Sequence, residues 1–278
     1  MLNSTLEKRE LLPVYNSVLA VALETAQREL KTIFTSPEIL QARINNELPF
    51  NTWYIPNGAE YASKGSKLAV IEHGTKVFTP DTIRAKRKNQ LDYGFVEVTD
   101  DELKAVLEES DERAVVSIKD LRKNGDSKLP RNYAVIMPLS NAQKAKSERL
   151  TQEEWIKNDI VLAKSGSVER ASAYFKKATE TYRVNTLGSW HRFNEAKDIK
   201  QKNLGRLSYV GGVDFGGLDG VNYFSGNGRF VGVRAVGAQK SPQEIKTPTL
   251  EEILRVSKPF VADSTREDFE KTIIKLYQ

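Results

Sequence analysis

The sequence predicts an α+β protein from three observations: a glycine-rich segment, several apolar runs of strand length, and amphipathic segments that begin with helix caps. Ten of the seventeen glycines lie between Gly205 and Gly237. Short apolar runs alternate there with Gly-Gly, Asp-Gly and Gly-Asn-Gly, which favour tight turns with positive φ. We therefore expect a compact antiparallel β-meander in this segment.

The N-terminal segment has apolar residues at helical spacing from Ser4 to Ile33. This spacing predicts one long amphipathic helix, with a possible break at Pro13, whose apolar face could contact another subunit. Ser36-Pro37 predicts an N-cap and the first position of a second helix, because proline fits the first helical turn. Residues 1–48 are thus expected to form a helical arm.

Residues 49–140 are expected to form a small α+β unit. Short apolar runs separated by Gly and Pro turns predict strands, and Thr99 with Glu102 predicts a capping box for one helix. The later strand candidates are Tyr93 to Val98, Ala114 to Ile118 and Tyr133 to Met137.

Residues 141–245 are expected to contain basic helices followed by the glycine-rich strands. Thr151 with Glu154 predicts one helix start, and Ser167 predicts another. Residues 246–278 are expected to form C-terminal helices, because Thr249 and Ser264 are each followed three positions later by glutamate.

Composition excludes several classes of protein. The chain has 278 residues with 39% hydrophobic and 28% charged content, as in ordinary globular proteins. It has no cysteine and two histidines, so a disulfide scaffold, a thiolate nucleophile and an imidazole-rich metal site are not expected. We predict no cofactor and no membrane span, and the lack of an export signal favours the cytoplasm or an assembly built there.

The charge is distributed unevenly along the chain. The net charge is +5, yet residues 113–206 contain 20 Lys and Arg against 10 Asp and Glu. A basic middle indicates a polyanionic partner, either nucleic acid or an acidic protein surface. The alternative is that the lysines only solvate helix faces.

Aromatic residues and cations alternate in the basic middle. Single-stranded nucleic acid is often bound this way, with cations on phosphates and rings stacked on bases. At helical spacing, however, the same rings are typical of a core. The candidate nucleic-acid-binding residues are Lys176, Lys177, Tyr182, Arg183, Trp190 and Arg192.

A metal-dependent nuclease is an alternative hypothesis. Asp81, Glu102 and Lys104 resemble a paired-acid-plus-lysine site, in which carboxylates hold Mg²⁺ and the lysine assists an attacking water. The capping box offers another explanation for Glu102, because an acid in the first turn interacts favourably with the helix dipole.

Three further motifs favour structural explanations. Asp214-Phe215-Gly216 spells a kinase metal-binding triplet, but no glycine-rich loop or His-Arg-Asp motif precedes it, so Asp214 and Asp219 are interpreted as turn residues. Gly226-Asn227-Gly228 could bind an anion, but a hairpin turn fits it better. His73 has no Gly-x-Ser-x-Gly motif beside it that would indicate a hydrolase, and His191 is the only other histidine.

The run from Gly228 to Val236, GRFVGVRAV, is similar to the last strand of C-type-lectin-like modules. Such modules, which are related to formylglycine-generating enzymes and some phage receptor-binding proteins, end in a Gly-aromatic-Arg run after Gly-rich loops. The Trp-rich motif expected upstream of that strand is missing here.

The leading hypothesis from the sequence is a non-catalytic binding or assembly protein, as in a viral or nucleoprotein complex, that contacts nucleic acid through the basic middle. Besides the nuclease, a third hypothesis is a ligand- or receptor-binding module that uses the Gly-rich loops. Its binding should survive high salt, whereas nucleic-acid binding should weaken steeply.

Overall fold

The structure is a computed structural model that describes residues 10–195, 197–212, 217–221, 224 and 226–234. It confirms the predicted α+β class, with helices and mixed sheets in one unit that ends at Val236. The predicted C-terminal helices of residues 246–278 lie outside the described residues. Within the described part, no helix is long and apolar enough to cross a membrane.

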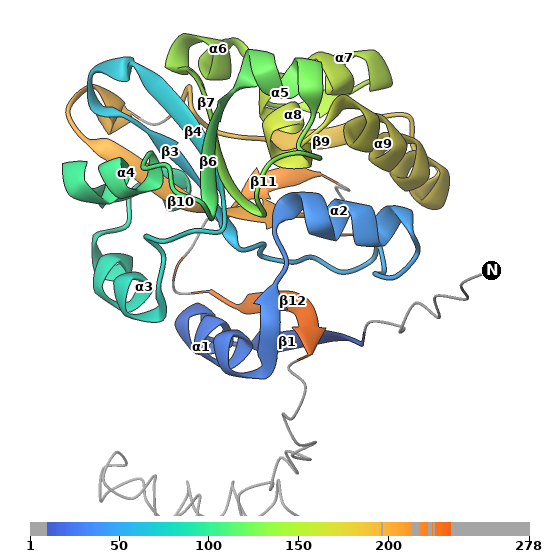
Figure 1. Cartoon of the computed structure of the whole chain (residues 1–278), viewed down its shortest axis with the longest axis horizontal. Coiled ribbons are helices and arrows are strands. Elements are labelled where there is room, and N and C mark those ends of the chain that lie inside the picture. Colours follow the sequence, from blue (N-terminus) through green and yellow to red (C-terminus); the bar gives the residue numbers. More distant parts are fainter. Residues whose placement is uncertain (1–9, 196, 213–216, 222–223, 225, 235–278) are drawn as a thin grey trace, which may run out of the picture. The chain divides into compact units, whose positions relative to one another are not determined.

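The larger sheet combines parallel and antiparallel pairs (Figure 1). Its strand order is β6 (Arg113–Ser117), β7 (Asn132–Pro138), β4 (Leu68–His73), β3 (Gly58–Ala62), β10 (Asn203–Val210), β11 (Leu218–Gly220), β9 (Leu187–Trp190) and β8 (Arg149–Leu150). Strand β5 (Val96–Val98) also pairs with β10. Strands β9 and β11 are parallel, as are β6 and β7, and the other pairs are antiparallel.

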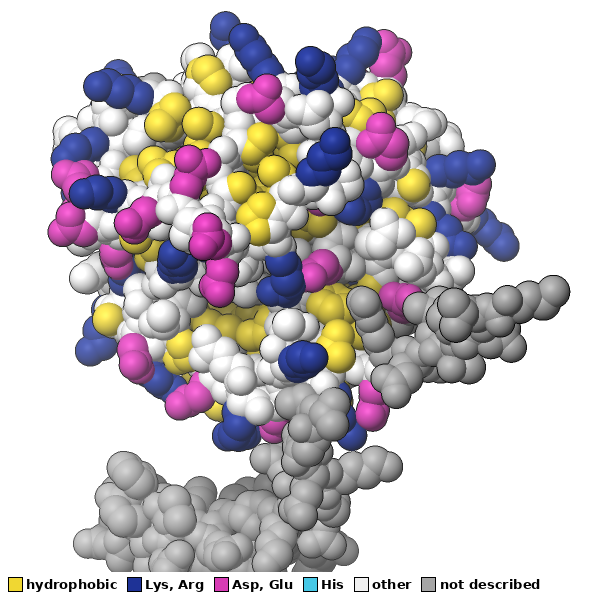
Figure 2. Space-filling model, in the orientation of Figure 1, with side chains coloured by type: hydrophobic (Ala, Val, Ile, Leu, Met, Phe, Trp, Pro, Cys, Tyr) yellow, Lys and Arg dark blue, Asp and Glu magenta, His cyan; other side chains and the backbone are white. Residues whose placement is uncertain are grey.

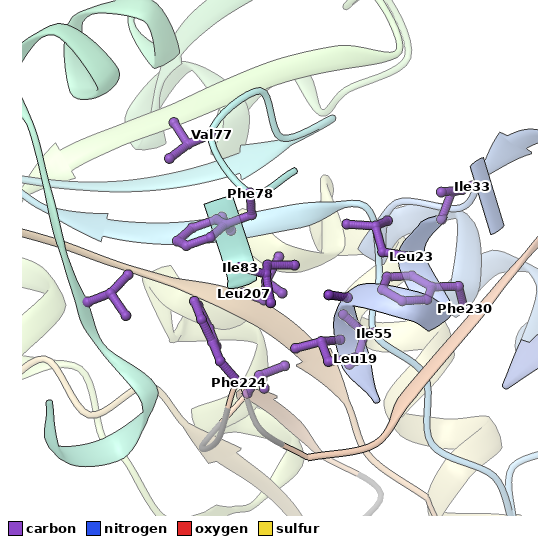
Figure 3. Close-up of a cluster of buried hydrophobic side chains, with 14 of the residues drawn as sticks. Leu19, Leu23, Ile33, Ile55, Val77, Phe78, Ile83, Leu207, Phe224 and Phe230 are labelled. Atoms are coloured by element: carbon purple, nitrogen blue, oxygen red, sulfur yellow. The ribbon is translucent and has the colours of Figure 1, made fainter. Parts of the chain in front are cut away.

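A second, three-stranded sheet joins the two ends of the described chain. Strand β12 (Gly228–Arg234) lies between β1 (Leu11–Asn16) and β2 (Leu30–Ile33), antiparallel to both. Helix α1 (Leu19–Glu29) covers one face of this sheet, where Leu19 and Leu23 pack near Phe230 (Figure 3). Deleting one such buried side chain costs about 2–5 kcal/mol, so the two ends of the described chain stabilise each other.

The predicted long N-terminal helix is wrong. Strand β1 precedes α1, and β2 follows it with no break at Glu29. Two strands flank the helix because β12 supplies ladder partners on both sides. Pro13 fits the edge strand β1, where a missing N–H is tolerated. The apolar face of α1 packs inside the molecule through Leu19, Ala22, Leu23 and Ala26.

The glycine-rich segment forms strands as predicted, but they do not form a meander. Strands β10 and β11 are an antiparallel pair. Strand β11 pairs next with β9, in parallel, and β12 joins the other sheet. A meander requires sequential antiparallel neighbours, and the long-range partners β9, β1 and β2 replace them here.

The remaining helices cover the large sheet or flank it, and α5 to α9 lie together at the top of Figure 1. They are α2 (Ser36–Ile44), α3 (Pro80–Lys86), α4 (Asp100–Val106), α5 (Ile118–Asn124), α6 (Leu139–Lys144), α7 (Gln152–Lys157), α8 (Asp159–Ser165) and α9 (Val168–Tyr182).

The structure has the predicted capping boxes of α4 and α7 and the predicted Ser167 cap of α9. For α2, the capping residue is Thr35 rather than Ser36, with Glu38 completing the box.

Candidate functional site

Three residues on neighbouring strands form a row across one end of the large sheet. Tyr209 on β10 is the register partner of Asp219 on β11, and Asp219 is the register partner of Trp190 on β9. Residues paired in this way project their side chains to the same face. The cross-strand row of Tyr209, Asp219 and Trp190 therefore presents an acid between two aromatic rings.

Trp53 extends this row beyond β10. Its ring stacks on that of Tyr209, with centroids 5.8 Å apart. The backbone fixes this placement, because Tyr54 exchanges two hydrogen bonds with Val210 and the N–H of Ile55 donates to Arg229 O at 2.7 Å. Trp53 is thereby attached to both β10 and β12.

Arg43 of α2 fastens the loops on both sides of this ring pair. Its buried guanidinium donates to Gly211 O at 2.8 Å, to the hydroxyl of Tyr174 at 2.9 Å and to Thr52 O. Thr52 and Gly211 lie next to the Trp53 and Tyr209 segments in the chain. An interior side chain thus fixes the geometry of a partly exposed site.

The rings border a hollow of about 500 Å³, which we call the Asp219 hollow. Aromatic rings, one carboxylate and backbone from two glycines give it a mixed apolar and polar wall, which is typical of ligand sites. The lining residues are Trp53, Ile55, Tyr209, Asp219, Gly220, Val221, Gly226 and Asn227.

Two arginines stack on the tryptophans of this region. The guanidinium of Arg229 lies 5.3 Å from the Trp53 ring centroid and 5.0 Å from that of Tyr15, its register partner on β1. Arg192 lies 5.4 Å from the Trp190 ring centroid and 5.1 Å from that of Tyr93. Tyr15 is 51% exposed and Tyr93 41% exposed, so both stacks reach the surface.

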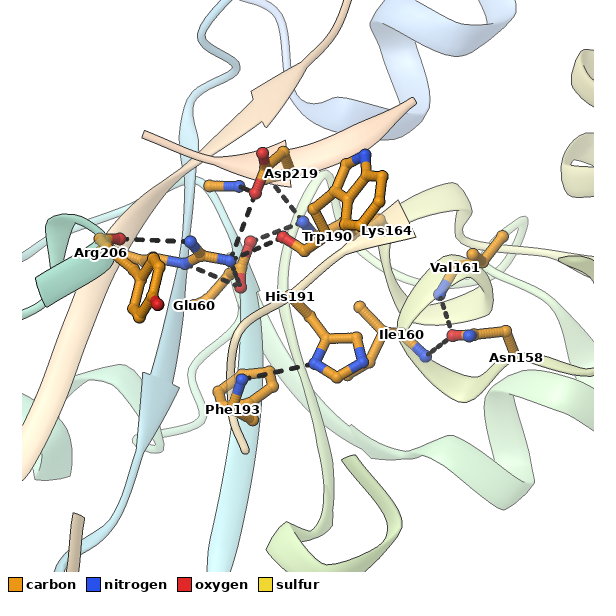
Figure 4. A network of polar contacts seen from close by, with 12 residues as sticks. Glu60, Asn158, Ile160, Val161, Lys164, Trp190, His191, Phe193, Arg206 and Asp219 are labelled. Atoms are coloured by element: carbon orange, nitrogen blue, oxygen red, sulfur yellow. Dashed lines mark hydrogen bonds and ion pairs between the residues drawn. The ribbon is translucent and has the colours of Figure 1, made fainter. Parts of the chain in front are cut away.

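A buried ionic network lies beneath the cross-strand row (Figure 4). Glu60 on β3 forms ion pairs with Lys164 of α8 at 2.5 Å and with Arg206 of β10 at 3.1 Å. All three side chains are at most 1% exposed. Arg206 lies 3.6 Å from Asp219 Oδ1, and Lys164 donates to Asp219 O at 2.7 Å. Asp219 therefore connects the interior network to the hollow.

The charges of the network act on each other. Burial alone would raise the pKa of Glu60, but Arg206 and Lys164 lower that pKa below its usual value. Burial lowers the pKa of Lys164, which Glu60 opposes. Burial also raises the pKa of Asp219, although Arg206 and Lys164 favour its carboxylate form.

The two histidines are buried and have structural roles in the interior. Burial lowers the pKa of each to about 4. His73 Nε2 lies 2.9 Å from Ala163 O, and His191 Nε2 lies 2.8 Å from Ala145 O. Each ring is therefore neutral at pH 7 and bonded to a backbone carbonyl, as a core histidine would be.

The structure separates the predicted nucleic-acid-binding residues into two groups. Lys176, Lys177, Tyr182 and Arg183 belong to α9 and its C-cap, where the Tyr182 hydroxyl donates to Phe50 O. Trp190 and Arg192 lie on and just after β9, at the end of the cross-strand row.

Some cations of the basic middle pair with acids from outside residues 113–206, and others pair with acids inside that segment. Figure 2 shows Lys and Arg interspersed with Asp and Glu over the visible face. The ion pairs of this segment include Arg113–Glu72, Arg122–Asp159, Arg131–Glu38, Lys146–Glu154, Arg170–Asp126, Arg192–Glu195 and Lys202–Glu97. Folding thus mixes charges that the sequence keeps apart.

The nuclease residues lie on two helices, and both acids have structural roles. Asp81 is in the first turn of α3 and pairs with Arg84 at 2.9 Å. Glu102 completes the α4 capping box and pairs with Lys86, while Lys104 lies further along α4. Within the described residues, no group of three potential metal ligands occurs. Asp214 lies outside the described residues.

Gly226 and Asn227 line the Asp219 hollow, and Gly228 begins β12. The principal residues of the site that the sequence did not indicate are Trp53, Tyr209 and Asp219. Trp53 and Tyr209 lie in apolar runs of strand length. Asp219 was interpreted as a turn residue but lies on β11, because β11 pairs with β10 and β9. The sequence signal of all three residues is weak because the site forms through pairing between segments distant in the chain.

Comparisons with known proteins identify the fold. The sequence matches no protein-family model and no curated protein. The structure is similar to a solved structure whose description reads "Accommodation of massive sequence variation in Nanoarchaeota by the C-type lectin fold". The two are 24% identical, the TM-score is 0.64, and the match covers 82% of this chain and 99% of the other. This chain therefore has the C-type lectin fold.

This result corrects the leading functional hypothesis. The hypothesis of a nucleic-acid-binding assembly protein, inferred from the basic middle, is wrong, because the fold found is the C-type lectin fold. That inference relied on the excess of basic residues along the sequence from 113 to 206. In the structure, acids from outside the basic middle pair with part of that excess, as in Arg113–Glu72, Arg131–Glu38, Lys164–Glu60 and Lys202–Glu97.

Proposed function

We propose that this chain is a ligand-binding module and that its binding face is the Asp219 hollow with the cross-strand row beside it. The observation that carries the proposal is the convergence of Trp53, Tyr209 and Asp219 around a hollow of about 500 Å³. Aromatic rings offer a large contact area at low conformational entropy cost, and they are enriched in recognition surfaces.

The construction of the site supports this function. The rings are partly exposed, but each is attached to a sheet strand or to a segment hydrogen-bonded to one. Binding groups on rigid elements lose little freedom when a ligand arrives, which favours affinity.

The similar solved protein adds a second argument. Its fold is described as accommodating massive sequence variation. In this chain, the interior network of Glu60, Lys164 and Arg206 is at most 1% exposed, whereas Trp53 and Tyr209 are only partly buried. Residues of the face can therefore change with less effect on the fold than residues of the interior, which suits a module that adapts to different ligands.

Binding to an acidic protein surface, contact with other subunits and a cytoplasmic location are not tested by these observations and stay predictions. The apolar face of α1, which was expected to mediate subunit contact, is used within the molecule. Subunit contact would need a different surface.

A fragment screen by NMR tests the proposed face. The ¹⁵N-labelled protein would be titrated with a set of small neutral, cationic and anionic fragments. We expect the amide signals of Gly220, Val221 and Asn227 to shift most. Two other hollows serve as internal controls, one lined by Asp100 to Glu108 and one by Asn141 to Asp159. Shifts confined to either control, or no shifts at all, would contradict the proposal.

A further inference from the structure

We propose that the group bound in the Asp219 hollow is a cation, either the guanidinium or the ammonium group of a ligand. This inference rests on the proposed function and adds the chemical class of the ligand. It follows from the charge exposed in the hollow, from an unused carboxylate oxygen and from the way the same surface already holds two guanidinium groups.

Among the residues that the structure describes, the wall of the hollow carries negative charge. Of the described residues that line it, Asp219 alone carries a charge. The cations of the network lie behind it, since the side chains of Lys164 and Arg206 are 1% and 0% exposed, whereas that of Asp219 is 21% exposed. A ligand entering the hollow therefore meets the carboxylate first.

The Asp219 carboxylate retains an oxygen for a ligand. Oδ1 accepts a hydrogen bond from the Gly220 N–H at 2.7 Å and faces Arg206 at 3.6 Å. Oδ2 accepts no hydrogen bond or ion pair from any residue that the structure describes. A carboxylate oxygen can only accept, so it suits an N–H donor, and a cationic donor makes the stronger bond.

The rings around Asp219 complete a cation site. Tyr209 and Trp190 flank it on the neighbouring strands, and Trp53 stacks on Tyr209. Aromatic faces attract cations, and desolvation strengthens this attraction.

The protein itself uses this mode twice within the same region. Arg229 lies 5.3 Å from the Trp53 ring and Arg192 lies 5.4 Å from the Trp190 ring. These two guanidinium groups border the row on either side of Asp219. A ligand cation would add a further positive charge to this alternation of rings and cations. Asp219 would supply its counter-charge, because among the described contacts neither Arg192 nor Arg229 pairs with Asp219.

The test compares two ligands that differ in charge. N-acetyl-arginine amide carries a guanidinium, and N-acetyl-citrulline amide is its neutral isostere. We expect the arginine compound to shift the amides of Gly220 and Val221 and to bind about tenfold more tightly than the citrulline compound. This comparison uses the wild-type protein, so it does not depend on the folding of a variant.

Two variants locate the charge effect. Asp219→Asn keeps the shape of the side chain and should abolish the preference for arginine over citrulline. Asp81→Asn is the matched control, since the Asp81 side chain is 93% exposed on α3, and it should leave the preference intact. Retention of the preference in Asp219→Asn would overturn the proposal.

The source of the cation is distinguished by two further compounds. Tighter binding of the tripeptide acetyl-Ala-Arg-Ala-amide than of agmatine would indicate a protein partner, and the reverse would indicate a small amine. Either result supports a cation site. Equal binding of arginine and citrulline compounds in the hollow would overturn the cation inference while the proposed function stands. If no fragment of any charge binds there, the proposed function fails as well.

Discussion

Arg206 Nη2 lies 3.6 Å from Asp219 Oδ1, at the point where the buried ionic network meets the candidate binding face. The same guanidinium pairs with Glu60 at 3.1 Å and donates to Trp190 O at 2.9 Å. One interior side chain thus contacts the acid and the backbone of one ring of the cross-strand row. The geometry of the face depends on the network beneath it.

Replacing Glu60 with glutamine should strongly destabilise the protein. The change leaves Lys164 and Arg206 as buried cations without their main counter-charge, which costs about 3–5 kcal/mol in free energy of unfolding. The measurement is urea denaturation followed by circular dichroism. The control is Glu153→Gln, which breaks an exposed pair with Lys157 and should leave the free energy of unfolding nearly unchanged. Equal losses in the two variants would contradict the account of the network.

The buried histidines should make stability depend on pH. Burial lowers the pKa of His73 and of His191 from 6.5 to about 4. Between these values the unfolded chain takes up protons that the folded chain does not, so the free energy of unfolding decreases as pH falls, by up to about 3 kcal/mol for each histidine.

Denaturation of the wild type and of the double variant His73→Gln, His191→Gln at several pH values measures this contribution. Burial raises the pKa of Asp219 and Glu72, and these two groups act on stability with the opposite sign. They are present in both proteins, so the difference between the two slopes of unfolding free energy against pH is due to the histidines. A variant with the same slope as the wild type between pH 6.5 and 4 would show that the histidines do not titrate as stated.

Binding of a cation in the Asp219 hollow should weaken in acid. Burial raises the pKa of Asp219, while Arg206 from β10 and Lys164 from α8 oppose this rise and Glu60 from β3 adds to it. The carboxylate binds the cation and the protonated acid does not, so affinity should fall as pH is lowered through that raised pKa.

Titration of N-acetyl-arginine amide at about pH 7.5 and at about pH 5 measures this effect. Asp219→Asn is the control and should bind weakly at both pH values. If the wild-type protein bound the arginine compound more tightly at the lower pH, this result would contradict a carboxylate site.

The strand assignment of the N-terminus can be tested by a disulfide, because the natural chain contains no cysteine. Tyr15 and Arg229 are register partners on β1 and β12, and adjacent strands place such Cα atoms within disulfide range. The double variant Tyr15→Cys, Arg229→Cys should therefore crosslink under oxidation, as seen by mass spectrometry.

The matched control pairs Tyr15→Cys with Thr32→Cys on β2. Strand β12 separates these two residues, so their distance of about 10 Å or more is too large for a disulfide. Crosslinking of the control, or none in the first variant, would be inconsistent with the three-stranded sheet.

Local chemistry in the sequence predicted the α+β class and several helix starts. The capping pairs of Thr99 with Glu102 and of Thr151 with Glu154 have the expected geometry, because a cap depends on residues three positions apart. The N-terminal strands were missed because Leu30 and Ile33 fit helical spacing as well as a strand, and no Gly or Pro marks the change at Glu29. Here the pairing with β12 decides the structure.

The binding face was less accessible to sequence reasoning. Trp190 and Arg192 were singled out for ring and charge content, and they do lie beside the candidate site. Trp53 and Asp219 were not, because one stacks on Tyr209 and the other meets Arg206 only after distant strands have paired. Long-range pairing creates the site, and no local pattern encodes it.

The most direct test of the binding face compares two substitutions against one ligand. A peptide would be selected on the wild-type protein from a random display library, and its affinity measured for Trp53→Ala and for the double variant Lys176→Ala, Lys177→Ala on α9. We predict that Trp53→Ala weakens binding by at least about tenfold with the fold intact, while the lysine variant binds as the wild type does. Loss of binding in the lysine variant with unchanged affinity in Trp53→Ala would contradict the proposed face.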